Sequence, residues 1–293
     1  MNKITLALTV AGLAAIVSSD ANAVENWTPY TDGIGIGSAA GALPPPGVYF
    51  QNTTYYADIK SHDGSGNYNG THITATVDVP VLLWAPDFKI LGAQYAAAIV
   101  QPFDTVNTTT AGVTHNNSGL FETVISPVNL SWELPNDLHF STGLGVYVPD
   151  GSFDKNKPGA PASSNFWAFE PSVGISWLHD GWNLSAKLLT DINLKNTDTN
   201  YTSGQVADVD LTASKTWGKW TAGLGVYERY QYTDDTQNGA KVGNGNRAQE
   251  FGLGPVVGYN FGPIAVEAFY TQAVSWKNES AGNRFFTRFT VPF

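Results

Sequence analysis

Apolar side chains recur at every second position along most of this chain. In the clearest run, Leu138, Phe140 and Leu144 alternate with small or polar residues. A period of two is that of a β-strand, whose successive side chains point to opposite faces, and helical periodicity is absent. The pattern predicts an all-β protein with strands near residues 47–60, 68–84, 88–101, 118–134, 138–149, 165–178, 182–194, 204–217, 220–234, 248–261, 264–277 and 283–293.

The connections between these segments alternate in length. Tight turns are expected at 135–137, 179–181, 218–219 and 262–263, and longer polar loops at 61–67, 102–117, 150–164, 195–203, 235–247 and 278–282. Short turns at one end and longer loops at the other are typical of outer-membrane barrels with an even number of strands. We therefore predict a closed antiparallel transmembrane β-barrel of about 12 strands, with both termini in the periplasm.

A soluble β-sandwich is the alternative fold, because it also has alternating strands. Sandwich strands are usually about 5 to 6 residues long. The segments predicted here are longer, and a tilted strand that crosses a membrane needs about 9 to 11 residues. Strand length therefore favours the barrel.

Tryptophans gather beside the predicted short turns. An indole ring at a membrane interface is buried while its N–H stays in contact with water, so these residues predict a belt facing outer-membrane lipids. The last strand ends on Phe293. An aromatic C-terminus resembles the signal that the barrel assembly machinery reads, and this machinery is an expected partner. The tryptophans of the belt are Trp84, Trp132, Trp177, Trp182, Trp217 and Trp220.

The composition agrees with an exported membrane barrel. Only 14% of the 293 residues are charged, against about 25% in an ordinary soluble domain. There is no cysteine, which excludes disulfides and thiol chemistry. The net charge of -10 argues against nucleic acid as a partner. No cofactor or metal site is expected, because the five histidines lack the spacing of metal ligands.

The N-terminal part divides into two segments. Residues 1–23 are predicted to be a signal peptide, with Lys3, a short apolar run and Ala21-Asn22-Ala23 as the cleavage site. Residues 24–46 are too rich in glycine and proline for a helix or a strand. They form either a short plug in the barrel mouth or a loose periplasmic tail, and the barrel follows over 47–293.

The stretch Leu43–Phe50 (LPPPGVYF), after the glycine-rich residues 32–37, carries a family resemblance. It is similar to the start of the meta-pathway phenol-degradation family of outer-membrane proteins. The resemblance implies an outer-membrane barrel whose relatives are associated with catabolism of aromatic and other apolar compounds and are regarded as uptake channels. It brings no catalytic residues.

Strand parity assigns charged side chains to the interior of the barrel. The excess of acids would favour the passage of cations if the pore is open and the charges are unpaired. Alternatively, interior ion pairs hold the barrel together, with Arg284 and Arg288 facing Glu267. Parity is weak near Pro127 and Glu228. The inward acids are Asp78, Glu133, Glu170, Asp191, Asp208, Asp210, Glu250 and Glu267, and the inward bases are Lys187, Arg229, Arg284 and Arg288. The pore-lining candidates among them are Glu170, Lys187, Glu250, Glu267, Arg284 and Arg288.

Two functions remain open at this stage. The preferred one is a porin-like, monomeric uptake channel for small hydrophobic or aromatic solutes, because aromatic side chains and glycines are expected inside. The alternative is a structural or surface-interaction barrel without transport activity. An enzyme is not expected. His139 and Ser141 have the spacing of an outer-membrane phospholipase, but they have no evident third partner and lie near the turn side.

Overall fold

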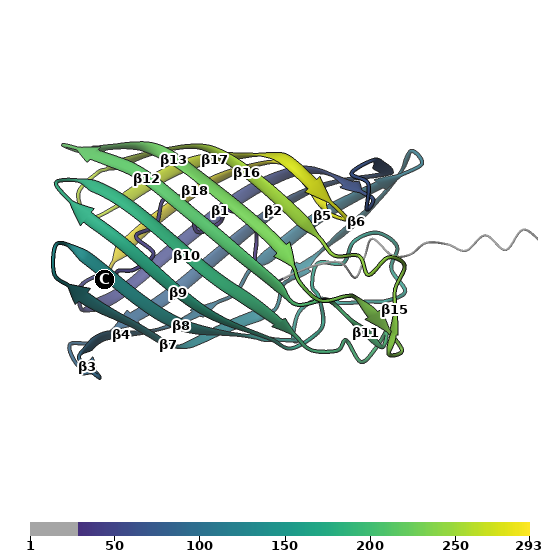
Figure 1. The fold of residues 1–293 in the computed structure, drawn as a ribbon, viewed down its shortest axis with the longest axis horizontal. Helices are drawn as coiled ribbons and strands as arrows, with labels where there is room; N and C mark the ends of the chain where they lie inside the picture. Colours follow the sequence, from purple (N-terminus) through teal and green to yellow (C-terminus); the bar gives the residue numbers. More distant parts are fainter. Residues whose placement is uncertain (1–28) are drawn as a thin grey trace, which may run out of the picture.

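The computed structural model describes residues 29–293, and they form one closed barrel of antiparallel strands (Figure 1). The predicted signal peptide, residues 1–23, lies outside this range. Within it, no helix is long and apolar enough to cross a membrane. The closed antiparallel barrel confirms the predicted fold, whereas the periplasmic location of both termini stays a prediction.

The barrel wall consists of twelve strands, as predicted from the alternation. Two of them are interrupted: β4 (Ala93–Val100) continues as β5 (Phe103–Thr110), and β6 (Val113–Leu120) continues as β7 (Thr123–Leu134). The continuous strands are β1 (Gly47–His62), β2 (Tyr68–Ala85), β8 (Leu138–Val148), β9 (Ala168–His179), β10 (Trp182–Asn193), β12 (Val206–Trp217), β13 (Trp220–Gln231), β16 (Gln249–Asn260), β17 (Ala265–Lys277) and β18 (Ser280–Pro292). Four short pieces, β3 (Lys89–Ile90), β11 (Tyr201–Thr202), β14 (Thr236–Gln237) and β15 (Ala240–Lys241), lie at the ends of the barrel.

The predicted loop over 102–117 is wrong, because β5 and β6 form a hairpin there. The threonine-rich sequence 105–110 favours extended backbone, since β-branched side chains suit a pleated sheet. Ala111 and Gly112 then turn the chain with φ of 51° and 79°. Two successive positive φ values suit the tight turn of a hairpin.

The barrel closes between the first and the last strand. β1 pairs with β18 on one side and with β2 on the other. β2 then pairs with β4 over Val81–Trp84 and with β5 over Thr71–Asp78. Both pieces of this interrupted strand are therefore paired with β2.

The two ends of the barrel differ as the sequence predicted. At the turn end, on the left of Figure 1, short hairpin turns join consecutive strands, and the C-terminus lies there too. Trp217 and Trp220 face each other across one of these turns, and both are more than half exposed, at 55% and 58%. At the loop end, on the right, the longer connections fold together. The expected tryptophan belt therefore lies on the outer wall at the turn end.

The apolar face of β2 points inward, opposite to the prediction. Ile73, Ala75 and Val77 are buried inside the barrel, whereas Asp78 is exposed on its outer face. There the Asp78 Oδ1 accepts a hydrogen bond from the Thr54 hydroxyl at 2.5 Å. Alternation separates the two faces of a strand but does not say which face points into the barrel. Asp78 is therefore not a lumen residue.

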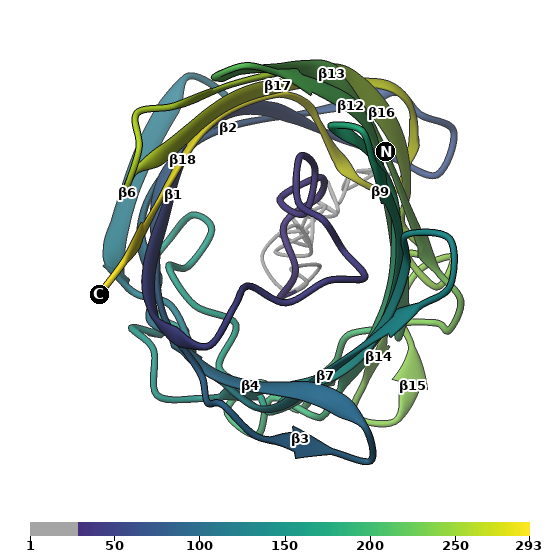
Figure 2. The same ribbon diagram turned by 90° about the vertical axis from the view of Figure 1, so that its left-hand side faces the viewer.

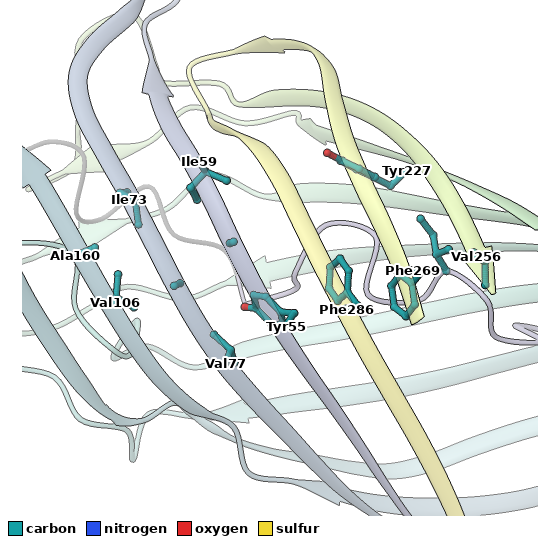
Figure 3. Close-up of a cluster of buried hydrophobic side chains, with 13 residues drawn as sticks. Tyr55, Ile59, Ile73, Val77, Val106, Ala160, Tyr227, Val256, Phe269 and Phe286 are labelled. Atoms are coloured by element: carbon teal, nitrogen blue, oxygen red, sulfur yellow. The ribbon is translucent and has the colours of Figure 1, made fainter. Parts of the chain in front are cut away.

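The inward apolar side chains of β1 and β2 belong to a cluster that extends along neighbouring strands to β17 and β18 (Figure 3). Tyr55 packs on Phe286 with ring centroids 5.2 Å apart, and Phe286 stacks on Phe269 at 4.5 Å. Most barrels of this class are polar inside and apolar outside. Along β1 and β2, part of the interior of this barrel is apolar.

Candidate functional site

Residues 29–46, which precede β1, lie inside the barrel, and we call them the lumen segment. Figure 2 looks into the turn end and shows this segment, in purple, within the ring of strands. It consists of successive turns, with the amides of Ile34, Ile36 and Ser38 donating to carbonyls three residues earlier at 3.1–3.2 Å. The segment thereby satisfies part of its own backbone without a helix or a strand.

Glycines of the wall let the segment approach closely. A Cβ on Gly225 would lie 2.2 Å from the Ile36 Cγ2, and one on Gly174 would lie 2.3 Å from the Ala40 carbonyl oxygen. Any larger residue at either position would collide with the segment. These inward glycines therefore shape the wall around residues 36–40.

Asp32 is the electrostatic centre of the contact. Its Oδ1 lies 2.9 Å from the Arg229 Nε, and its Oδ2 accepts a hydrogen bond from the Arg284 Nη2 at 2.7 Å. All three side chains are almost completely buried. Arg229 also donates to the Tyr30 carbonyl at 2.5 Å. A buried carboxylate between two guanidinium groups fixes the segment to β13 and β18.

A second group of contacts holds the segment farther along. Arg288 donates to the carbonyls of Ile34 and Ile36, the latter at 3.1 Å. On β12, the Asp210 Oδ2 accepts the Gly35 amide at 2.9 Å and also the Tyr30 hydroxyl. The segment is therefore bonded to the wall through side chains from several strands.

Wall hydroxyls complete the contact near residue 41. The Ser131 and Ser141 hydroxyls donate to the carbonyls of Gly41 and Ala40, each at 2.7 Å. The Gly41 amide donates to the Ser176 hydroxyl at the same distance. Ser141, considered above as a nucleophile, is thus a hydrogen-bond donor to the segment.

All six pore-lining candidates lie on the lumen side of the wall, and they form ion pairs. Arg284 pairs with Glu250 at 2.7 Å, and Arg288 pairs with Glu267 at 3.1 Å. Of the two pairings expected with Glu267, only that of Arg288 is present. The remaining two candidates meet on neighbouring strands, where the Lys187 Nζ lies 3.9 Å from Glu170. The Tyr147 hydroxyl also donates to Glu170, at 2.7 Å.

Beside the lumen segment, the barrel encloses a cavity of about 970 Å³. One side is apolar and is formed by inward residues of β2 and β4, among them Val79, Val81, Leu83 and Val100. The other side carries Glu170, Lys187, Arg229, Arg284 and Arg288. A volume of this size suits a small organic molecule.

Sequence reasoning missed Asp32 and the two inward acids Asp104 and Glu122. Asp32 lies in a segment without strand periodicity, so parity could not place it. Asp104 lies in the predicted loop, and Glu122 lies in the interruption between β6 and β7. For Asp104, the β-branched run that follows it was the one available signal.

The comparisons with known proteins agree with this architecture. A family model described as "Putative MetA-pathway of phenol degradation" matches residues 57–289. The chain belongs to this family. The resemblance noted in the sequence is thereby confirmed.

Among solved structures, this family member is similar to an outer membrane channel from Pseudomonas putida F1. The TM-score is 0.77 at 12% identity, covering 87% of this chain and 98% of that one. The β domain of the Bordetella autotransporter BrkA has a TM-score of 0.51 at 12% identity, covering 84% of this chain and 100% of the other. The sequence matches none of the curated proteins with which it was compared. At these identities the likeness concerns the fold, which is that of a bacterial outer-membrane barrel.

The chemistry of the lumen is that of ion pairs and hydrogen bonds. Among residues 29–293, no group of three or more histidine, aspartate or glutamate side chains is arranged to hold a metal ion. The site of this family member is therefore best described as a cavity with a bound segment of its own chain.

One acid at the loop end gives a pH-dependent prediction. Burial raises the pKa of Glu279, between β17 and β18, to about 8, although Arg229 lies 3.9 Å away. An acid with a raised pKa keeps its proton in the folded state, so the free energy of unfolding should fall as pH rises from about 4.5 to about 8. The slope of the unfolding free energy against pH reflects the number of protons bound by the folded state in excess of the unfolded state. Glu279→Gln should lower this number by up to about one.

Urea unfolding of the refolded barrel in vesicles across this pH range measures the effect. The exposed Asp87, changed to Asn, is the control and should leave the slope unchanged. An equal slope in the wild type and in Glu279→Gln would contradict the prediction.

Proposed function

We propose that this chain is an outer-membrane channel that takes up small apolar or aromatic solutes, with its turn end facing the periplasm. The inward apolar strip on β2 and β4 carries the proposal. Val79, Val81 and Val100 line the cavity, in a class of barrel whose interior is ordinarily polar. Water solvates such a wall poorly, so an apolar solute gains free energy by covering it.

The lumen segment acts as a plug in this proposal. It is bonded to residues of β7, β8, β9, β12, β13 and β18, and it narrows the passage to the cavity beside it. The aromatic side chains Tyr55, Phe121 and Tyr147 also face this cavity. Together they provide flat apolar surfaces on which an aromatic ring stacks.

The test changes the polarity of the strip while keeping the fold. Val79→Asn with Val81→Asn should reduce the uptake of N-phenyl-1-naphthylamine severalfold, because two amides replace apolar contacts. The measurement is the fluorescence increase in cells with an intact outer membrane that express the barrel. The matched control is Ser172→Asn, which adds an amide at a position lining the cavity that is already polar.

Folding of each variant is checked by its heat-dependent shift on electrophoresis. Uptake that is equal in the double variant and in the wild type would refute the apolar path. An equal loss in Ser172→Asn would mean that width, and not polarity, limits entry.

A further inference from the structure

Asp104 is a carboxylate in an apolar part of the cavity. It lies on β5, in register with Val77 of β2, and its side chain lines the cavity while being only 4% exposed. The next inward residue, Val106, belongs to the apolar cluster of Figure 3. Toward the turn end, Val79 and Val100 continue the apolar wall.

This carboxylate has no partner among residues 29–293. Its buried Oδ1 makes no hydrogen bond, and no lysine, arginine or histidine forms an ion pair with it. The charged group that acts on it is another acid, Glu122, which is itself fully buried and accepts the Asn165 amide at 2.5 Å.

Three other lumen acids differ from Asp104 in this respect. Asp32, Glu250 and Glu267 each face an arginine within 3.1 Å. A buried carboxylate without a counterion is costly, whereas a cation that approaches through the cavity would supply both the missing charge and the missing donor. The described residues provide no set of ligands for a metal ion there.

We propose that Asp104 binds the ammonium group of a solute whose apolar or aromatic body lies along Val79, Val81 and Val100. The proposal rests on the proposed function, since it specifies the polar end of the same apolar cargo. The ammonium donates to the carboxylate of Asp104, and Glu122 adds negative potential. The solute class is therefore a primary amine on an apolar or aromatic body.

The experiment compares 4-phenylbutylamine, 4-phenylbutanol and 4-phenylbutyrate, which share one apolar body. Their affinities for the full barrel in phosphatidylcholine nanodiscs are measured by equilibrium dialysis at pH 7, with empty nanodiscs subtracted. The wild type should bind the amine about tenfold or more tightly than the alcohol, and the acid least tightly. Asp104→Asn should reduce the affinity for the amine to that for the alcohol and leave the alcohol unchanged.

Asp78→Asn is the matched control. Asp78 neighbours Val77 on β2 and lies on the outer face. Its substitution removes the same charge as Asp104→Asn but outside the cavity, so amine binding should not change. If the alcohol binds but the amine has no advantage, or keeps it in Asp104→Asn, the ammonium site is refuted and the apolar channel stands. If none of the three compounds binds, the proposed function falls and the ammonium site with it. Should Asp104→Asn not fold, the ranking of the three compounds by the wild type still decides.

Discussion

Deleting residues 29–42 is expected to increase the entry of small solutes into proteoliposomes about tenfold or more. The deletion removes the plug, and the flux of solute scales with the fraction of barrels that are open. These residues fill the part of the lumen next to β12, β13 and β18, where Asp32 and Tyr30 are bonded to the wall. The deletion keeps Pro44–Pro46 and every strand of the barrel. Liposome swelling in arabinose measures the change.

A second variant separates removal of the segment from loss of its charges. Gly225→Val places a side chain where the Ile36 methyl groups lie, at 2.2 Å from the added Cβ, and should displace the segment without removing any charged side chain. The control is Gly145→Val, in the equivalent position of the repeated sequence GLGVY, where an added Cβ would lie 3.4 Å from the nearest atom. Entry that is unchanged in both the deletion and Gly225→Val would refute the plug.

The sequence predicted the wall of this barrel because the signals for strands and turns are local. A period of two is visible within one strand, and turn residues such as Asn136 and Asp137, with φ of 63° and 59°, mark the hairpins. The pairing of Arg288 with Glu267 followed for the same reason. The two lie on β17 and β18, which form a hairpin, and they are directly opposite in register.

The lining of the lumen depends on contacts that are remote in sequence. Asp32 reaches Arg284 across 252 residues, and Gly35 reaches Asp210 across 175. No spacing rule relates such positions. Likewise, the direction in which the apolar face of β2 points depends on whether its valines contact lipid or the cavity. Both are apolar environments, so the sequence pattern does not distinguish them. Parity alone therefore placed Asp78 inside.

The largest loss of stability is expected for Arg284→Met. Arg284 is the shared partner of Asp32 and Glu250, at 2.7 Å from each, and all three side chains are at most 6% exposed. Removing it leaves Glu250 with the Tyr227 hydroxyl and, among residues 29–293, no cation in contact. Breaking a buried pair from one side costs about 3–5 kcal/mol, because the remaining charge is uncompensated. Urea unfolding of the refolded barrel in vesicles measures this loss.

Arg288→Met is the matched control, four residues along the same inner face. Its acid partner, Glu267, is 24% exposed, so water can solvate the carboxylate that is left, and the loss should be clearly smaller. Adding Glu250→Gln to Arg284→Met should restore part of the lost stability, since it removes the uncompensated charge. If Arg284→Met is as stable as the wild type, the buried arginine does not hold this part of the barrel together. If Arg284→Met and Arg288→Met lose the same stability, burial of the acid is not what sets the cost.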